Sequence, residues 1–535
     1  MQVAGCWNRR LSRAEFLQLS GMTATAVLLG TGELRSGRAH AAPAFSADPF
    51  SLGVSSGDPR HHSVVLWTRL APEPLAPDGK GGMPPEPVAV RYELARDPDF
   101  HRVIRRGHVE ATPELAHSVH AVVRGLRPGF EYFYRFRVGS DVSPVGRTRT
   151  TPAGPVDSLR FALASCQRWQ DGFYTALGHI ADDEDLDLVV FVGDYIYENG
   201  IGAAGGARRL TGAQMLPAHF RTECTTLERY RCQCGLYKSD PDLQRAHAAL
   251  PWISTWDDHE VDDNYAGENA TAPTPPAVFL ARRAAAYQAH YEHMPLRRSS
   301  VPAGPDMQMY RSLPFGRLAK FQLLDGRQYR SDQACGAAQS TPCPESLDPA
   351  RTMLGAAQEE WLLDRLGTSK AKWNVLAQQT IMCRADRDPG PELRTSMDNW
   401  NGYSPARQRL FDGVAERGVE NLAVLTGDAH CSVAAELRLD YDDPDSATIG
   451  AEFVGTSVSS GGNGADVDGR GLDFLASNPH MRFYNARRGY VACTVKPELW
   501  RSDYRAVPLI TERDAPISTI ASFVVEAGRP GLQHA

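Results

Sequence analysis

The sequence predicts an α/β protein in which a small β-sandwich domain precedes a larger domain, and three observations indicate this. The chain has 535 residues, more than one hydrophobic core usually serves, so two domains and a leader are expected. An early region alternates aromatic or β-branched residues with polar ones, as half-buried strands do. A later region holds short, continuously apolar runs that are separated by helix-like segments.

The N-terminus has the order of an export signal. A basic segment at 9–13 precedes an apolar, small-residue stretch at 19–29, and a small-x-small cleavage site follows at 39–41. The apolar stretch is too short to cross a membrane, so the order indicates export rather than anchoring. The alternative is an N-terminal extension that stays disordered.

The leader also resembles the twin-arginine type, which exports folded proteins. Arg9-Arg10 are followed by Phe16-Leu17, although Ala14 stands where the pattern has arginine. We therefore predict an export signal at 1–41 that uses the twin-arginine translocase. The mature protein is expected in the periplasm, on the cell surface or in the medium.

Residues 45–152 are predicted to form a fibronectin/Ig-like β-sandwich. Strand-like runs stand at 63–67, 88–92 and 130–136. The turn at 126–129 leads into the last of them, as in fibronectin type III sandwiches. A Thr/Pro/Gly-rich segment at 148–157 then predicts a boundary before the larger domain at 158–527.

The larger domain holds the continuously apolar runs, which suit strands of a sheet that is covered on both faces. These runs are 159–164, 186–192, 320–324, 373–377 and 421–425. Each ends in a polar or Gly-rich cluster, and the carboxyl ends of such strands are where α/β sheets place their chemistry. The chain has no apolar run in its body that would span a membrane, and its net charge of -7 predicts no specific nucleic-acid partner.

Ten cysteines are present, and removal of the leader would leave nine. An odd number in an exported protein fits four disulfides and one thiol with a separate task. Cys335 and Cys343 flank a Gly/Ser/Pro-rich loop and are the pair that we expect.

Polar residues with metal-binding chemistry follow three of the predicted strands and the segment at 252–255. They stand in the segments Ser165-Cys166-Gln167, Gly193-Asp194-Tyr195-Ile196-Tyr197, Trp256-Asp257-Asp258-His259-Glu260 and Gly427-Asp428-Ala429-His430. Glycine before Asp194 and Asp428 permits a tight turn, so that each carboxylate can project into a shared cleft.

This set resembles the calcineurin-like metallophosphoesterases, and within them the PhoD-type alkaline phosphatases. Later segments at 324–330, 452–457 and 478–484 are similar to blocks of the same family. The resemblance implies a four-layer metallophosphoesterase sandwich of two mixed β-sheets flanked by helices. It also implies hydrolysis of phosphate esters at a centre that holds two or more metal ions.

The resemblance and the residue types together suggest two unlike metal positions, with Asp194 as the bridge between them. Cys166, Tyr197 and His430 would form the first, where a thiolate and a phenolate favour Fe3+. Asp258 and Asp428 would form the second, where oxygen donors favour Ca2+, and Asn264 is expected to add a carbonyl oxygen.

The remaining polar residues have expected roles around these positions. The nucleophile would be a hydroxide generated from metal-bound water, with His259 as general acid or as a hydrogen-bond donor to phosphate. Asp257 and Glu260 are expected to accept hydrogen bonds in a turn rather than to bind metal. Arg327 either holds phosphate or forms a structural ion pair.

The leading functional hypothesis is an alkaline phosphatase with monoesterase or diesterase activity, or both, that scavenges extracellular organic phosphate. Its partners would be small phosphate esters. One alternative is a phospholipase D-type phosphodiesterase that acts on phospholipids. A less favoured alternative is a non-catalytic adhesion protein on the same scaffold.

Overall fold

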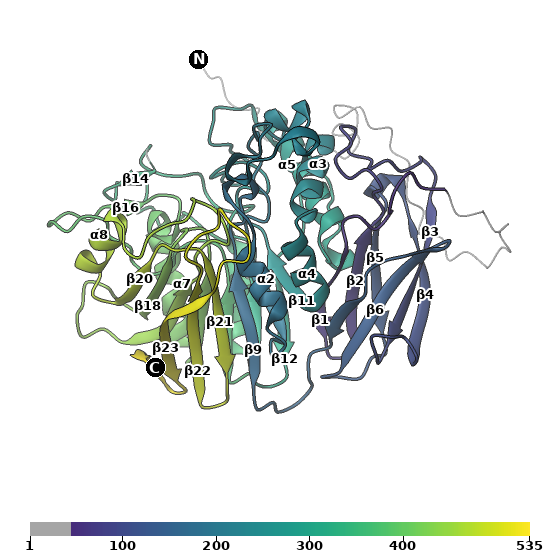
Figure 1. The fold of residues 1–535 in the computed structure, drawn as a ribbon. Helices are drawn as coiled ribbons and strands as arrows, with labels where there is room; N and C mark the ends of the chain where they lie inside the picture. Colours follow the sequence, from purple (N-terminus) through teal and green to yellow (C-terminus); the bar gives the residue numbers. More distant parts are fainter. Residues whose placement is uncertain (1–43, 337) are drawn as a thin grey trace, which may run out of the picture. The chain divides into compact units, whose positions relative to one another are not determined.

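The computed structural model describes residues 44–336 and 338–535. The predicted export signal at 1–41 lies outside these residues. Among the helices that are described, none has both the length and the apolar composition needed to cross a lipid bilayer. The elements named below follow one another along the chain as Figure 1 traces them.

The largest sheet has ten strands and carries two of the predicted apolar runs, 159–164 and 186–192, at its centre. Its order is β24 (Arg529–His534), β23 (Ser518–Glu526), β22 (Leu499–Ala506), β21 (Gly489–Val495), β9 (Leu159–Ala164), β10 (Leu188–Val192), β11 (Pro251–Thr255), β1 (Val54–Arg60), β2 (Ser63–Arg69) and β5 (Ser118–Arg124). β9, β10 and β11 are parallel neighbours. Their carboxyl ends therefore meet at one edge of the sheet.

A second, mixed sheet has seven strands and contains the other predicted runs. Its order is β12 (Arg311–Phe315), β13 (Ala319–Leu323), β15 (Trp373–Ala377), β17 (Leu422–Thr426), β19 (Thr448–Val454), β18 (Ser432–Arg438) and β20 (Met481–Asn485). β13, β15, β17 and β19 run parallel. A separate pair consists of β14 (Gln339–Ser340) and β16 (Thr395–Ser396).

Both sheets are covered on their outer faces by helices and share a buried apolar core between them. The helices are α2 (Thr175–Asp182), α3 (Leu227–Lys238), α4 (Pro241–Ala249), α5 (Pro276–His293), α6 (Ala356–Gly367), α7 (Ser404–Glu416) and α8 (Gly469–Ser477). α2 to α5 pack on the ten-stranded sheet and α6 to α8 on the seven-stranded one. Phe161 and Phe321 meet edge to face in the core between the sheets. This burial on both faces explains why the central strands read as continuous apolar runs.

Short 3₁₀ turns connect many of these elements. They are η1 (Pro113–Leu115), η2 (Trp169–Asp171), η3 (Gly206–Arg208), η4 (Gly212–Gln214), η5 (Ala218–Arg221), η6 (Arg298–Ser300) and η7 (Trp400–Tyr403). Three of them fall between β10 and α3.

The N-terminal strands form two layers around one core, but the two layers are not equally independent. One layer is a five-stranded sheet of β4 (Val103–Ala111), β3 (Val88–Ala95), β6 (Glu131–Val138), β7 (Asp141–Val142) and β8 (Gly146–Arg149). The other consists of β1, β2 and β5, and β1 pairs in parallel with β11. The second layer is thus continuous with the large central sheet.

The cysteines differ from the predicted pattern. Cys335 and Cys343 form the expected disulfide. The other seven cysteines among the described residues are free and buried, so the expectation of four disulfides is wrong. Counting cysteines misled here because free cysteine also serves as a small buried hydrophobic residue.

Candidate metal centre

The predicted ligands lie where strands of the two sheets end. Cys166, Asp194 and Asp258 follow β9, β10 and β11, and Asp428 and His430 follow β17. The two sheets approach closely at this point, because Ser165 forms an isolated β-bridge with Ser457. The folds of the two sheets thus bring distant segments to one place.

Several of these residues have a left-handed backbone. Their φ angles are 58° for Cys166, 56° for Asp194, 56° for Asn264, 58° for Asp428 and 52° for His430. This region is uncommon for residues other than glycine, costs free energy, and is concentrated at functional sites. The sharp turns point each side chain off the end of its strand.

The first group of donors joins both sheets. One donor atom each from Cys166, Asp194 and His430 lie within 4.8 Å of one another. The hydroxyl of Tyr197 donates to Asp194 Oδ2 over 2.7 Å and lies 3.0 Å from His430 Nε2. Ser460 Oγ donates to the same tyrosine oxygen over 2.7 Å. The four residues predicted for the first metal position therefore lie together, three of them buried and His430 partly buried.

A second group of donors is adjacent and mostly acidic. Donor atoms of Asp257, Asp258 and Asp428 lie within 4.8 Å of one another, and so do those of Asp194, Asp258 and His259. Asp194 and Asp258 thus each belong to more than one group. The side-chain amide of Asn264 donates to Asp263, and only its backbone N–H donates to Asp258. A side-chain metal ligand at Asn264 stays a prediction.

The buried charges of the centre need a positive partner. Asp194 Oδ1 and Asp258 Oδ1 are buried and have no hydrogen-bond partner among the described residues. Burial raises the pKa of Asp194 well above its usual range, and the charges of Asp258 and Asp257 add to this effect. Burial likewise raises the pKa of the Cys166 thiol and of the Tyr197 phenol. Cations would pair with these oxygens and favour the ionised thiol and phenol, so the donor set fits metal ions.

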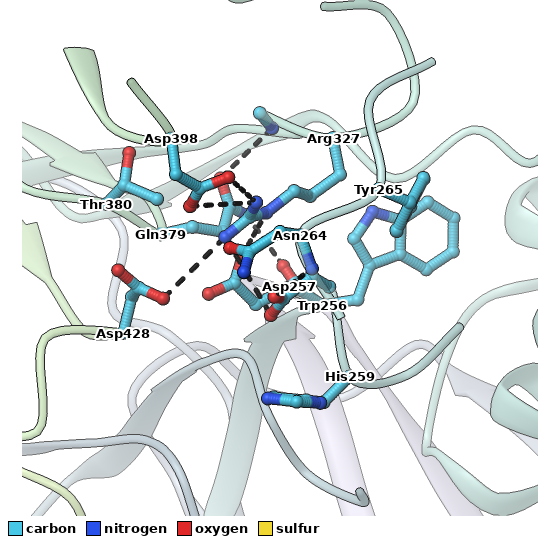
Figure 2. A network of polar contacts seen from close by, with 12 residues as sticks. Trp256, Asp257, His259, Asn264, Tyr265, Arg327, Gln379, Thr380, Asp398 and Asp428 are labelled. Atoms are coloured by element: carbon cyan, nitrogen blue, oxygen red, sulfur yellow. Dashed lines mark hydrogen bonds and ion pairs between the residues drawn. The ribbon is translucent and has the colours of Figure 1, made fainter. Parts of the chain in front are cut away.

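Arg327 supplies one internal positive charge. Its side chain is fully buried, forms ion pairs with Asp257 and, at 2.8 Å, with Asp398, and lies 3.8 Å from Asp258 Oδ1 and 3.7 Å from Asp428 Oδ1. Figure 2 shows the guanidinium between Asp257, Asp398 and Asp428. Of the two roles considered for Arg327, the structure shows the ion pair.

His259 lies beside the donors and has its own acidic partner. Its Nδ1 is 2.7 Å from Glu198 Oε2, and its ring packs against that of Tyr197 with 4.1 Å between centroids. Burial alone would lower the pKa of His259, but the charges of Asp258, Asp194 and Glu198 outweigh it and raise that pKa well above its usual value. These acidic neighbours favour the protonated form of the imidazole.

Glu260 was expected to accept hydrogen bonds, and it accepts them from the backbone N–H groups of Asp194, Tyr195 and Asp257.

Three supporting residues were not predicted from the sequence, namely Glu198, Asp398 and Ser460. Glu198 could have been noticed as an acid next to the Gly-Asp block, but nothing local marks the other two.

Metal-dependent hydrolases typically place their metal ligands at the ends of strands in an α/β fold. The centre described above has this arrangement, with carboxylates, a thiol, a phenol and an imidazole. Comparison with known proteins narrows the class. The family model described as PhoD-like phosphatase matches residues 161–504, and that of the PhoD-like phosphatase N-terminal domain matches residues 36–152. The chain therefore belongs to the PhoD-like phosphatase family. The prediction of a phosphoric ester hydrolase is confirmed at this level.

Two relatives illustrate the similarity. Alkaline phosphatase D of Bacillus subtilis (strain 168) is 47% identical over 535 residues, which cover 98% of this chain and 89% of the relative. A solved structure described as "Structure of PhoD" is 48% identical in sequence and has a TM-score of 0.87. The match covers 92% of this chain and 93% of the chain in that structure. Membership in this family favours a hydrolase over the non-catalytic alternative.

Proposed function

We propose that this protein is an alkaline phosphatase that uses a centre of two or more cations to hydrolyse small phosphate monoesters, diesters or both. The observation that carries the proposal is the position of Asp194. Its carboxylate groups with Cys166 and His430 on one side and with Asp258 and His259 on the other, and one of its oxygens is buried without a partner among the described residues. A carboxylate placed in this way can hold two cations close enough to share one phosphoryl group. The sheets and their outer helices correspond in this proposal to the four-layer sandwich of the metallophosphoesterases.

The donor chemistry supports two different cations. Cys166, Tyr197 and His430 would hold Fe3+ together with Asp194, because thiolate and phenolate ligands suit that ion. Asp258 and Asp428 would hold Ca2+, which prefers oxygen ligands. When bound, the cations would neutralise phosphoryl oxygens and lower the pKa of the attacking water.

The chain's own residues would supply the remaining steps. Glu198 orients the His259 ring through Nδ1, so that Nε2 can donate a proton to the leaving oxygen. Glu260 fixes the backbone at Asp194, and Arg327 keeps the acidic side of the centre from excess negative charge. No serine or threonine nucleophile is needed in this scheme.

The test is the variant Asp194→Asn, with metal content and activity measured on the same preparation. We expect bound iron and calcium both to fall. Hydrolysis of p-nitrophenyl phosphate should fall by more than about a hundredfold, since even outer partners of metal ligands contribute about 10- to 100-fold. Thr271→Ala, which removes an exposed hydroxyl that donates to the backbone oxygen of Asp263, is the control. Full activity of Asp194→Asn would refute the proposal.

The identity of the first cation has a spectroscopic test. A phenolate bound to Fe3+ gives a charge-transfer band in the visible range, and Tyr197→Phe should abolish it. Protein that carries only zinc or magnesium, or a band that survives in Tyr197→Phe, would overturn the iron assignment.

A phospholipase D-type activity is the second candidate, because apolar side chains are exposed on α8. Leu472 is 65% exposed and Leu475 is 42% exposed. α8 follows the segment around Ser460 that contacts Tyr197. Rates on p-nitrophenyl phosphate, bis-p-nitrophenyl phosphate and phosphatidylcholine vesicles would rank the substrates. A Leu472→Glu, Leu475→Glu variant that loses only the vesicle activity would favour the lipid substrate.

We also propose that the protein is exported by the twin-arginine route and scavenges organic phosphate outside the cytoplasm. Cell fractionation of the chain with both Arg9 and Arg10 replaced by lysine tests this. The variant should stay in the cytoplasm, uncleaved, while the unaltered chain is found outside it.

A further inference from the structure

Two arginines, Arg387 and Arg470, lie next to the turn after β17 that carries His430. Arg387 is in the loop after β15, and β15 and β17 are parallel neighbours, so this loop leaves the sheet at the same edge as the turn. Arg470 is in the first turn of α8, and its Nε donates to the Tyr484 hydroxyl over 3.2 Å. Tyr484 pairs with Val433, just after the turn. Both arginines are thus placed beside a ligand-bearing turn of the candidate metal centre.

Aromatic rings hold the two side chains close to each other. The guanidinium of Arg387 lies over the Phe474 ring, 5.4 Å from its centroid, and that of Arg470 lies over the Tyr484 ring at 5.8 Å. The two rings meet edge to face with 6.2 Å between their centroids. Burial lowers the pKa of Arg387, and the charge of Arg470 lowers it further. The two positive charges are therefore close enough to repel each other.

Neither guanidinium has an acidic partner. Within residues 44–336 and 338–535, no carboxylate lies within 4.0 Å of either one, whereas Arg487 of the same region pairs with Asp466 at 2.7 Å. In this part of the chain the Arg387 guanidinium donates no hydrogen bond, and that of Arg470 donates only the one to Tyr484. None of their unpaired nitrogens is enclosed by the protein. These donors are therefore accessible to a ligand from solvent.

Unpaired arginines are usually solvated surface charges, but the position of these two differs from that. Both are partly buried and packed on rings, whereas a flexible surface side chain would turn away from a like charge. Like charges that are held side by side cost free energy, and a bound anion removes that cost. The pair is therefore arranged to receive a negative group.

The pair also lies within electrostatic influence of the candidate metal ligands. The charge of Asp428 opposes the effect of burial on the pKa of Arg387. Burial lowers the pKa of His430 to about 3, and the charge of Arg470 adds to this effect. One small substrate can therefore contact both the metal centre and the arginine pair.

We propose that Arg387 and Arg470 bind a second anionic group of the substrate, so that the enzyme prefers phosphate esters whose alcohol part carries a carboxylate or another phosphate. This specificity rests on the proposed function, because the scissile phosphoryl group is the one held at the metal centre. A guanidinium suits such a group, since it presents parallel N–H donors to the two oxygens of an oxyanion. Selection of the alcohol part is thereby assigned to α8 and to the loop after β15.

The test compares three substrates of the metal-loaded enzyme by the rate of phosphate release. 4-Carboxyphenyl phosphate and 4-carbamoylphenyl phosphate have nearly the same size but differ by one negative charge, and 4-phosphonophenyl phosphate carries a second oxyanion that water does not remove. We expect wild type to have a higher kcat/KM for both anionic substrates than for the amide, mainly through a lower KM. Arg387→Met and Arg470→Met should each reduce this preference about tenfold, as loss of a hydrogen bond to a charged group does. The larger preference identifies carboxylate or phosphate as the favoured group.

Two further variants separate anion binding from a structural role. Arg470→Lys keeps the charge and should retain part of the preference. Arg487→Met removes a positive charge from the same region, but one that Asp466 already neutralises, and it should leave the preference unchanged. Loss of the bond between Arg470 and Tyr484 would slow all three substrates alike. Arg387→Met breaks no side-chain hydrogen bond of the described residues, so it tests the preference without that effect.

Equal kcat/KM of wild type for all three substrates overturns the proposal, and so does a preference that is the same in both methionine variants as in wild type. In either case phosphate is still released from the amide, and the proposed function stands. Wild type that releases phosphate from none of the three would instead refute the proposed function, and this specificity with it.

Discussion

Arg327 shows at the residue scale how the charges of the candidate centre are held. It is fully buried and faces four carboxylates, two of them as direct ion pairs. Arg327→Met leaves Asp257 buried without its counter-charge and Asp398 paired with Arg330 alone, and breaking a buried pair from one side costs about 3–5 kcal/mol. We expect that loss in urea unfolding of the metal-loaded protein, together with loss of activity.

The matched variant is Arg327→Lys, which keeps the charge but cannot bond to both carboxylates with a planar group. It should lose less stability than Arg327→Met while still being impaired in catalysis. Equal stability of Arg327→Met and wild type would mean that Asp257 and Asp398 do not depend on Arg327.

The site residues differ in how far the sequence could predict them. Cys166, Asp194, Asp258 and Asp428 each follow an apolar strand, so local pattern and the family resemblance place them at one edge. Ser460 contacts Tyr197 across 263 positions of sequence, and Asp398 reaches Arg327 across 71. Contacts over such distances leave no local pattern, because they depend on how the two sheets are assembled.

The turn after β10 is the element on which the position of Asp194 depends. Gly193 has a φ of +109°, and a Cβ at this position would lie 2.4 Å from Asp257 Cβ and 2.7 Å from its backbone nitrogen. Gly193→Ala must therefore shift the β10 turn or the β11 turn. We expect it to lose more than about 2 kcal/mol of stability in urea unfolding, as overpacked and strained sites do, and to bind less metal.

Gly202→Ala is the control, because nothing lies within 4 Å of its added Cβ. This variant should stay within about 0.5 kcal/mol of wild type, as surface substitutions usually do. A Gly193→Ala protein that also keeps wild-type stability and metal content would show that the turn is not what positions Asp194.

The strands themselves were predictable, but their distribution between sheets was not. β9, β10, β15 and β17 lie at or within two residues of the predicted runs. Each of these strands is buried on both faces. A strand that is apolar on both faces carries no information about its neighbours, so the division into ten and seven strands follows from the assembled fold.

The continuity of the N-terminal strands with the central sheet is a property of the whole described unit. β1 pairs with β11, and Asp58 at the end of β1 forms an ion pair with Arg311 at 2.8 Å. The Trp67 indole donates to the Glu292 carbonyl of α5. Alternating strand patterns predict a sandwich layer, but they cannot show that its edge pairs with another sheet.

This continuity predicts that the N-terminal strands and the larger α/β region unfold together. Thermal unfolding should be one transition by calorimetry and by circular dichroism. The separate fragment 158–535 should aggregate, because removal of β1 exposes the edge of β11. A fragment that folds alone, or two resolved transitions in the whole chain, would contradict this expectation and support two independent domains at 45–152 and 158–527.

Buried neutral histidines should make the whole protein sensitive to acid. Burial, with a smaller contribution from the charge of Arg298, lowers the pKa of His120 to about 4, and burial mainly lowers that of His290 to about 3 and that of His480 to about 4. In the unfolded chain each would titrate near 6.5, so the unfolded state binds more protons between these values. Stability is therefore fully present above pH 6.5 and falls as the pH falls towards 4.

His120 offers a test of this effect away from the metal centre. It stacks on Tyr291 with 4.3 Å between ring centroids, and its Nδ1 lies 3.1 Å from the Leu296 carbonyl. A single histidine with this shift costs about 2 kcal/mol at pH 5 relative to pH 8. We expect His120→Gln to reduce the loss of unfolding free energy between these two pH values by that amount, measured in urea at each pH. An unchanged loss would mean that His120 is already charged in the native protein, or that it becomes exposed before the chain unfolds.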